Sequence, residues 1–206
     1  GITIFSGQAE FAGKESEFVL LDTPGHVDFC AEMERTLSVL DYAILLISGK
    51  DGIQAHTTTL WRLLKSYNIP TFIFVNKMDI KGTESSALMG EIQEAFGRAC
   101  FDVELAKASA PLVQNSAEAA KASAPLAQGS AEAAKSSAAL EDIAMCDETL
   151  LEEFLESETI SRNSLAKAIK SRRLFPCFFG SALKLTGIDE LINGLDELTL
   201  IPDYLC

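Results

Sequence analysis

The stretch PTFIFVNKMD, residues 70–79, joins an apolar run to a short polar turn. Continuous apolar runs of this length are typical of strands that are buried on both faces. The polar part begins at Asn76, where the strand is expected to end. Because parallel sheets bind ligands at the carboxyl ends of their strands, this junction predicts both a central strand and a functional loop.

Three further runs have the same form, and each ends in small or polar residues. They are FVLLD at 18–22, YAILLIS at 42–48 and LFPCFFGS at 174–181. Between and after the runs, apolar residues recur at helical spacing in residues 27–40, 57–69 and 186–198. Strands that alternate with helices predict an α/β fold with a mostly parallel sheet. The first 22 residues predict a hairpin-like pair with a turn near GKES, residues 13–16.

Composition excludes several classes of protein. No apolar run approaches the roughly 20 residues of a membrane span, and no signal segment is visible. The net charge of −13 argues against unspecific adhesion to nucleic acid or anionic lipid. Five scattered cysteines without a C-x-x-C pair are typical of a reducing cytosol and argue against a zinc ribbon or a disulfide framework.

The middle of the chain differs from both ends. KASAPLVQNSAEAA at 107–120 recurs with two changes at 121–134. This Ala/Ser-rich unit has too few large apolar residues to bury much surface. The predicted organisation is therefore a first part at 1–100, a low-complexity insertion at 101–146 and a second part at 147–206.

The motif DTPGH, residues 22–26, carries the first candidate chemistry. A carboxylate at a strand end can hold Mg²⁺, and a glycine in a tight turn lets its backbone N–H approach a terminal phosphate. The histidine that follows can orient an attacking water. A plain strand, turn and helix with a solvated His26 explains the motif equally well when it is taken alone.

The motif NKMD, residues 76–79, fits recognition of guanine. The carboxylate of Asp79 can accept both the ring N–H and the exocyclic amine of guanine, whereas adenine would leave it unpaired. The aliphatic stem of Lys77 can lie over the base, and Asn76 can tie neighbouring loops together. GSAL at 180–183 can offer backbone N–H groups to a base carbonyl, although this motif is nearly uninformative by itself.

Together, these three loops resemble the GTP-binding domain of translational GTPases. GITI at 1–4 is similar to a switch segment of that family, and DTPGHVDF at 22–29 looks like elongation factor G and especially the tetracycline ribosomal-protection proteins. The resemblance covers Gly1 to about Gly97, and Asp147 to about Leu198 more loosely. Ile80, which stands where elongation factor G usually has arginine, and the Ala-rich repeat favour the protection proteins.

The resemblance implies a three-layer P-loop NTPase-like domain with GTP or GDP as ligand and Mg²⁺ as cofactor. It implies that Thr3 and Asp22 lie at the metal, the Gly25 backbone at the γ-phosphate, and His26 at the attacking water as the catalytic residue. It further implies a guanine pocket made by Asn76, Lys77, Asp79, Ser181, Ala182 and Leu183. The implied partner is the ribosome in the cytoplasm, without membrane or direct DNA binding.

One expected element is missing from the sequence. A GTPase needs a G-x-x-x-x-G-K-[ST] loop to cradle the phosphates. The two Gly-Lys pairs, at Gly13 and Gly49, are followed by Glu15 and Asp51 instead of a hydroxyl residue. The family's first strand, phosphate loop and first helix are therefore expected to be absent, which leaves two strand edges exposed in the sheet.

Two readings follow from that absence. Because the chain begins with Gly1, it is expected to be a fragment or a processed product of a GTPase whose phosphate loop lies upstream. The alternative is a truncated, non-enzymatic chain that keeps the fold but does not bind or hydrolyse GTP. Tetracycline protection, translocation and termination or recycling share this domain, and the sequence leaves the choice among them open.

Overall fold

The computed structural model describes residues 7–14, 16–23, 35–109 and 139–201. Thr3, Gly25 and His26, to which the resemblance assigns roles in metal binding and catalysis, lie outside these residues. Residues 110–138, which hold most of the Ala/Ser-rich repeat, lie outside them as well. Within the parts of the chain that are described, no helix is both long and apolar enough to cross a bilayer.

Four parallel strands form the main sheet, in the order β3-β4-β6-β5. The strands are β3 (Ala43–Ser48), β4 (Thr71–Asn76), β6 (Phe175–Phe179) and β5 (Cys100–Asp102). The apolar runs predicted β3, β4 and β6 correctly. The three-residue β5 was missed, because so short a strand carries no readable pattern.

The strand β4 explains how the sheet is built. All its residues from Thr71 to Val75 are buried, because helices cover both faces of the sheet. Phe72 and Phe74 point to one face, whereas Ile73 and Val75 point to the other. Such alternation across a strand divides the interior into two apolar layers.

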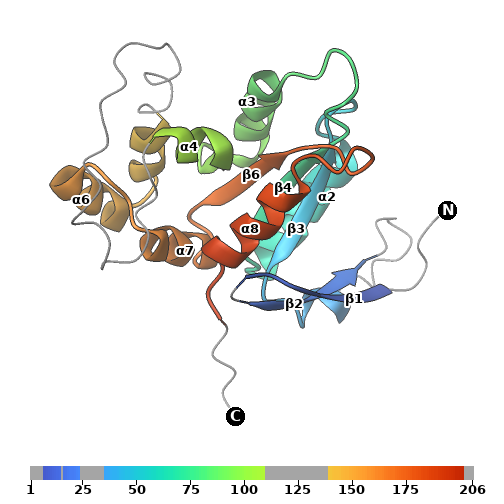
Figure 1. Ribbon diagram of the computed structural model, residues 1–206, viewed down its shortest axis with the longest axis horizontal. Coiled ribbons are helices and arrows are strands. Elements are labelled where there is room, and N and C mark those ends of the chain that lie inside the picture. Colours follow the sequence, from blue (N-terminus) through green and yellow to red (C-terminus); the bar gives the residue numbers. More distant parts are fainter. Residues whose placement is uncertain (1–6, 15, 24–34, 110–138, 202–206) are drawn as a thin grey trace.

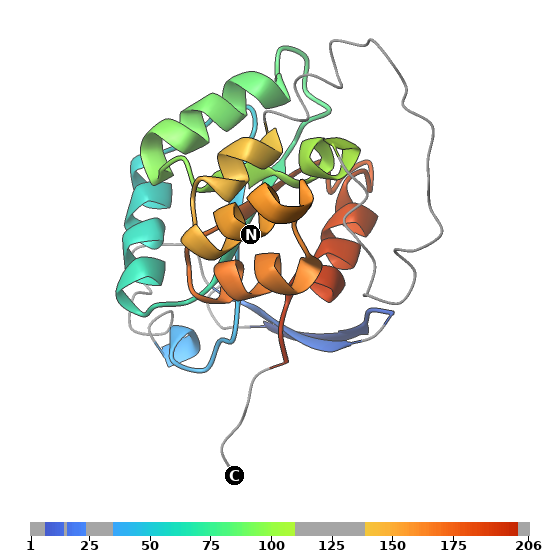
Figure 2. The ribbon, with the colours of Figure 1, turned by 90° about the vertical axis from the view of Figure 1, so that its left-hand side faces the viewer.

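Helices α2 (Ala55–Ser66) and α3 (Ser85–Phe96) cover one face of the sheet. Trp61 and Leu64 of α2, together with Leu88 and Ile92 of α3, pack against that face. Figure 2 shows these two helices on one side and α8 (Ile188–Leu198) on the other. The helix periodicity in residues 57–69 and 186–198 therefore predicted α2 and α8 correctly.

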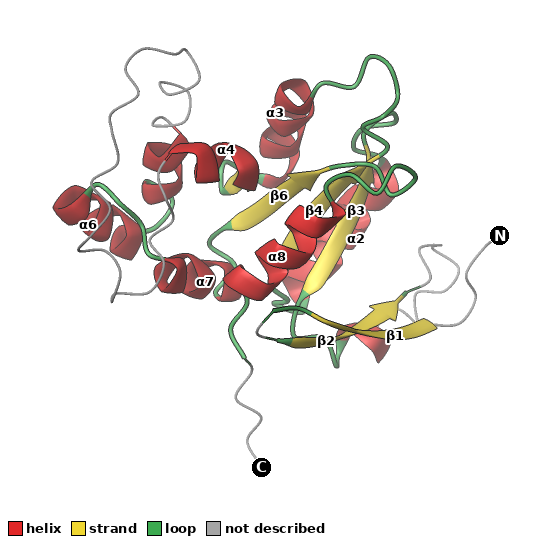
Figure 3. Cartoon of the chain, in the orientation of Figure 1, coloured by secondary structure: helices red, strands yellow, loops and turns green. Residues whose placement is uncertain are grey.

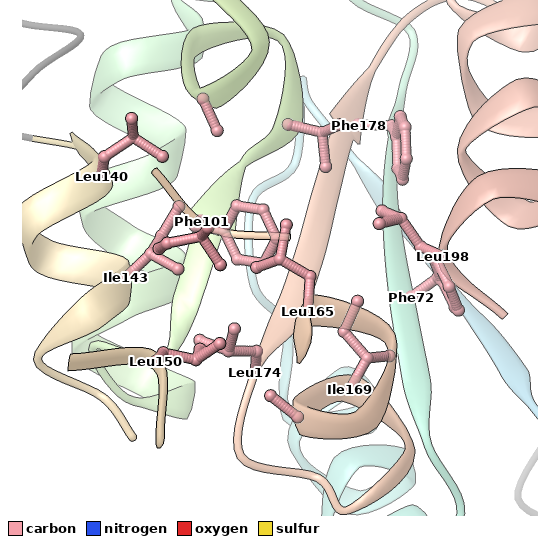
Figure 4. Packing of buried hydrophobic residues seen from close by; sticks show 14 of the residues in the cluster. Phe72, Phe101, Leu140, Ile143, Leu150, Leu165, Ile169, Leu174, Phe178 and Leu198 are labelled. Atoms are coloured by element: carbon pink, nitrogen blue, oxygen red, sulfur yellow. The ribbon is translucent and has the colours of Figure 1, made fainter. Parts of the chain in front are cut away.

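The opposite face is covered by α4 (Val103–Ser109), α6 (Glu148–Ser157), α7 (Arg162–Lys170) and α8. Figure 4 shows their side chains meeting the sheet, with Leu165 and Ile169 of α7 beside Leu174. Phe101 and Val103 belong to this core, as do Leu140 and Ile143. The predicted insertion at 101–146 therefore begins and ends with residues that pack in the core.

The acidic segment at 147–173 forms two helices, α6 and α7, that are separated by a short break. Glu158 ends α6 in the left-handed conformation, with a φ of 55°. The Ser161 side chain then accepts a hydrogen bond from the Ser164 amide and starts α7. A serine at this position caps a new helix, which explains the break.

A separate antiparallel hairpin lies beside the β3 edge of the sheet (Figure 1). It consists of β1 (Gly7–Ala12) and β2 (Glu17–Asp22), joined by a turn in which the Gly13 amide donates to the Ser16 carbonyl. The predicted hairpin and its turn are thus confirmed. Among the described residues, β2 pairs with β1 alone and not with β3, so the run at 18–22 is not a strand of the main parallel sheet.

Candidate functional site

The candidate site lies at the carboxyl ends of β4 and β6, where two loops meet. One loop follows β4 and contains Asn76, Lys77 and Asp79, and the other follows β6 and contains Ser181, Ala182 and Leu183. Because β4 and β6 are adjacent and parallel, their ends fall at the same edge of the sheet. Residues that are more than one hundred positions apart are brought together in this way.

Asn76 joins the two loops, as the sequence predicted. Its side-chain oxygen Oδ1 accepts a hydrogen bond from the Ala182 amide at 2.9 Å and another from the Lys77 amide at 2.7 Å. The Met78 amide also donates to the Gly180 carbonyl at 3.0 Å. The bonds from Ala182 to Asn76 and from Met78 to Gly180 fix the position of one loop relative to the other.

Lys77 is held in a particular conformation at the start of its loop. Its φ of 67° lies in the left-handed region, which non-glycine residues adopt mainly at turns and functional sites. Its Nζ lies 3.8 Å from Oδ2 of Asp51, which also accepts a hydrogen bond from the Ser48 hydroxyl at 2.7 Å. The Asp51 carboxylate thus limits where the exposed stem of Lys77 can lie.

Sequence reasoning missed the contributions of Asp51 and Thr83. Asp51 follows β3, the strand next to β4, so its place at a neighbouring strand end was a usable signal. The Thr83 hydroxyl lies 3.1 Å from the Met78 carbonyl oxygen and 2.7 Å from that of Ile80, and donates to this pair. It stabilises the turn that presents the exposed side chain of Asp79.

The second loop is closed by a short two-residue ladder. The Ser181 amide donates to the Thr186 carbonyl at 2.9 Å, and the Thr186 amide donates back at 3.1 Å. Ser181 is buried, whereas Ala182 and Leu183 are exposed at the tip of the loop. Leu183 therefore lies at the exposed tip of the loop, next to the Ala182 amide that donates to Asn76.

Gly180 is required by this close packing. A Cβ at this position would lie 2.2 Å from the Thr186 carbonyl oxygen, which is closer than any real contact of that kind. We expect Gly180→Ala to lower the free energy of unfolding by about 1–3 kcal/mol, the usual cost of overpacking, and to displace the 180–187 loop. Urea denaturation and the amide chemical shift of Ala182 measure the two effects.

Gly90→Ala is the matched control for Gly180→Ala. Gly90 lies on the exposed side of α3, and a Cβ there would meet nothing within 4 Å. Alanine in a helix interior is expected to raise the free energy of unfolding by roughly 0.5–1 kcal/mol. A Gly180→Ala variant as stable as the native chain would contradict the required packing.

The phosphate and metal side of the site is only partly described. Asp22 is exposed at the end of β2, in the hairpin beside the sheet. A carboxylate oxygen suits Mg²⁺, which commonly takes only one or two protein oxygens together with phosphate oxygens. Among the described residues, no group of three or more His, Cys, Asp or Glu side chains could hold a metal by itself.

The chain is similar to known proteins along nearly its whole length. Residues 1–200 match the family described as the elongation factor Tu GTP binding domain. The chain therefore belongs to this family of GTP-binding domains from translation factors.

Three individual proteins show how similar the chain is to tetracycline resistance proteins and to elongation factor G. The chain is 34% identical over 202 residues to the tetracycline resistance protein TetW of Butyrivibrio fibrisolvens, covering 96% of this chain and 29% of that protein. It is 36% identical over 207 residues to TetM of Streptomyces lividans, covering 98% and 30% respectively. Elongation factor G of Ureaplasma parvum serovar 3 is 29% identical over 222 residues, covering 98% and 32%. The chain thus spans less than a third of these relatives.

A solved structure agrees with the fold. A protein from Thermus thermophilus superposes with a TM-score of 0.75 at 23% identity, covering 97% of this chain and 32% of that one. At this level of identity the likeness concerns the fold alone. It confirms the α/β class that the alternating strands and helices predicted.

Proposed function

We propose that this chain is the guanine-recognising part of the G domain of a ribosome-associated translational GTPase, which hydrolyses GTP to GDP and phosphate. The observation that carries the proposal is the pair of bonds from Ala182 to Asn76 and from Met78 to Gly180. They hold the NKMD loop against the GSAL loop, so that the Asp79 carboxylate and the tip of the GSAL loop lie at the same edge of the sheet.

In this proposal each loop recognises a different part of the base. The Asp79 carboxylate accepts the ring N–H and the exocyclic amine of guanine. The amide of Leu183 faces the base carbonyl oxygen, while Ser181 and Ala182 close the base pocket through their amide hydrogen bonds to Thr186 and Asn76. The Lys77 stem covers the flat surface of the ring. The exposed positions of Asp79 and Leu183 support this assignment, since both residues are open to a ligand from solvent.

The catalytic roles come from family likeness. We propose that Asp22 and Thr3 supply oxygen ligands to Mg²⁺, which would neutralise phosphate charge during transfer. We propose that the Gly25 amide contacts the γ-phosphate and that His26 positions the attacking water. Release of the Thr3 and Gly25 segments after hydrolysis would change the affinity for the ribosome.

We further propose that the phosphate loop is supplied by polypeptide outside these 206 residues. None of the Gly-Lys pairs in the sequence meets the phosphate-loop pattern. Without that cradle of amides and its lysine, the electrostatic grip on the β- and γ-phosphates is weak. The 206 residues alone are therefore expected not to bind GDP with submicromolar affinity and not to hydrolyse GTP.

A titration with fluorescent GDP tests the proposal on two proteins. The 206-residue chain is expected to show no submicromolar affinity, whereas the protein extended by its own upstream coding sequence is expected to bind and to hydrolyse GTP faster when ribosomes are added. Tight binding by the short chain would refute the need for an external phosphate loop. Absence of binding by the extended protein would favour the non-enzymatic alternative.

The relatives suggest which ribosomal process is served. TetM and TetW are tetracycline resistance proteins, and their identity to this chain is higher than that of elongation factor G. We favour ribosome protection in the cytoplasm over translocation for this reason. Release of ribosome-bound tetracycline by the extended protein would separate the two functions.

A further inference from the structure

A cleft lies at the edge of the main sheet opposite the candidate site. It has a volume of about 530 Å³, within the range of roughly 300–1,000 Å³ that is usual for ligand pockets. Tyr42 and Pro70, which line it, directly precede β3 and β4, so the cleft lies at the amino ends of these strands. The length of β4 separates it from Asn76 by about 17 Å.

Two segments of the chain meet at this cleft, and both lack acidic residues. Residues 52–78 contain no Asp or Glu, and neither do residues 159–188, which hold six Lys or Arg. The Arg172 guanidinium joins the two segments, because it donates to the Ile69 carbonyl and, at 3.1 Å, to the Thr71 hydroxyl oxygen. Figure 3 shows α7 beside the start of the β6 arrow, which points away from α7 toward the other edge of the sheet. A chain with a net charge of −13 thus has a surface of the opposite sign at this edge.

Three exposed lysines carry the positive charge of this edge. Lys65 lies in the last turn of α2, and Lys167 and Lys170 lie in the last turn of α7. Lys170 also lines the cleft. Among the described residues, no carboxylate forms an ion pair with any of the three, whereas Arg173 of the same segment is paired with Asp147. The three ammonium groups are therefore available to an anionic partner.

An aromatic ring stands beside these lysines. Tyr67 lines the cleft and is 42% exposed, and it is the one aromatic residue among the exposed large apolar side chains of the described part of the chain. Its backbone is fixed at the end of α2, where its amide donates to the Leu63 carbonyl at 3.0 Å. In the same cleft, the Tyr42 hydroxyl accepts a hydrogen bond from the Leu200 amide at 2.9 Å. An exposed ring on a fixed backbone is a surface on which a nucleic-acid base can stack.

The helix ends alone do not explain this surface. A lysine in the last turn of a helix balances the negative end of the helix dipole, which accounts for Lys65 and Lys170 one at a time. It does not account for the exposed ring of Tyr67, for the cleft, or for the absence of acidic residues from both segments. Asp41 is the acidic residue among the described walls of the cleft, and because it repels phosphate, a phosphate is expected on the Lys170 side.

We propose that this edge of the sheet binds single-stranded RNA, with one base stacked on Tyr67 in the cleft and the neighbouring phosphates on Lys65, Lys167 and Lys170. An unpaired nucleotide combines a flat ring with negative charge, and the surface complements both features. An acidic peptide offers the charge without the ring, and duplex RNA keeps its bases stacked inside the helix. The choice of RNA as the nucleic acid rests on the proposed function in translation, whereas the binding surface itself does not.

The test is a titration of the 206-residue chain, without guanine nucleotide, into a fluorescein-labelled RNA of eight adenylates, followed by fluorescence anisotropy. Binding with a Kd on the order of 10⁻⁵ M is expected at roughly 50 mM salt. Each phosphate contact to a single strand contributes about −0.7 to the slope of the logarithm of the association constant against the logarithm of the salt concentration. Three lysine contacts therefore predict a slope of about −2.

Substitutions separate the contribution of the ring from that of the charge. Tyr67→Ala is expected to weaken RNA binding at least about 5-fold, and Tyr67→Phe is expected to stay within about 2-fold of the native chain, because the ring remains. Lys170→Gln is expected to weaken binding by about 3-fold to 10-fold and to reduce the salt slope by about 0.7. Lys184→Gln removes the same charge from the same acid-free segment but at the other edge of the sheet, and this matched control is expected to leave binding unchanged. Urea denaturation checks that each variant is folded.

Several outcomes would overturn the inference. Absence of RNA binding at low salt would do so, and equal binding by the native chain and Tyr67→Ala would show that no base stacks on this ring. A loss in Lys184→Gln equal to that in Lys170→Gln would show that the RNA is not held at this edge. A polyglutamate peptide or duplex RNA that competes as well as the single strand would contradict the choice of ligand. Because no GDP enters this experiment, failure of RNA binding and failure of the proposed nucleotide function are observed separately.

Discussion

Replacing Asp147 by alanine is expected to lower the free energy of unfolding by about 2–4 kcal/mol, the largest stability loss that we predict for a single side chain. Asp147 is buried and lies just before α6. Its Oδ1 accepts hydrogen bonds from the Thr149 amide at 2.8 Å and the Leu150 amide at 3.3 Å. Its Oδ2 pairs with the Arg173 guanidinium. Alanine removes the helix cap and the ion pair together.

Asp147→Asn separates the cap from the charge. Asparagine can still cap the helix, so the expected loss is smaller, about 1–2 kcal/mol. Burial alone would raise the pKa of Asp147, but hydrogen bonds from Thr149 and Leu150 and the charge of Arg173 outweigh it and lower this pKa. The charged form is therefore favoured in the folded state.

The lowered pKa sets the sign of the pH dependence. A carboxyl group with a depressed folded pKa stabilises the protein above its unfolded value of roughly 3.9, and this stabilisation disappears as pH falls through the folded value. The stability difference between the native chain and Asp147→Asn is thus expected to be full at pH 6 and to shrink below about pH 4. Urea denaturation at several pH values measures it.

Asp142→Asn serves as the control for the pH series, since Asp142 is exposed in the preceding helical segment. Its effect is expected to stay within about 0.5 kcal/mol, as is usual for surface substitutions. If Asp147→Asn behaves in the same way at pH 6, the ion pair between Asp147 and Arg173 contributes nothing measurable to stability.

Three of the four strands of the main sheet could be predicted, because each carries a continuous apolar run that is typical of a strand inside a sheet. The run at 70–76 gave β4 within one residue, and the run at 42–48 gave β3 equally well. The run at 18–22 also gave a strand, but no pattern in it distinguishes a strand of the sheet from a strand of a separate hairpin. Pairing depends on which edges are occupied, and a single strand sequence does not encode this.

In the candidate site, too, some contacts could be predicted from the sequence and others could not. The motif NKMD indicated that Asn76 can tie neighbouring loops together, and the Ala182 amide of the second loop donates to its side chain. The part played by Asp51 was not predicted, because it depends on the turn after β3 bringing a carboxylate within 3.8 Å of Lys77. Contacts of this kind follow from loop conformation, which local sequence specifies weakly.

Replacing Asp79 by asparagine is expected to lower the affinity of the extended protein for GDP by about 10²–10⁴-fold. The carboxylate offers two acceptors to the two N–H donors of guanine. Asparagine turns one acceptor into a donor, so an N–H group would face the exocyclic amine of the base. Xanthine has a carbonyl at that position, and its nucleotide is therefore expected to bind the variant better than GDP does.

The control for this change is Asp51→Asn, which weakens the contact to Lys77 without touching the base. Both partners of that ion pair are about half exposed, so its loss is expected to alter GDP affinity by less than 10-fold. Competition of GDP, xanthosine diphosphate and ADP against fluorescent GDP measures all three proteins. Equal GDP affinity of the native protein and Asp79→Asn would mean that Asp79 does not contact the base. An equal loss of GDP affinity in Asp51→Asn and Asp79→Asn would instead indicate a general disturbance of the loop. Asp51 contacts this loop only through Lys77, and Asp79 lies in the turn that Lys77 begins.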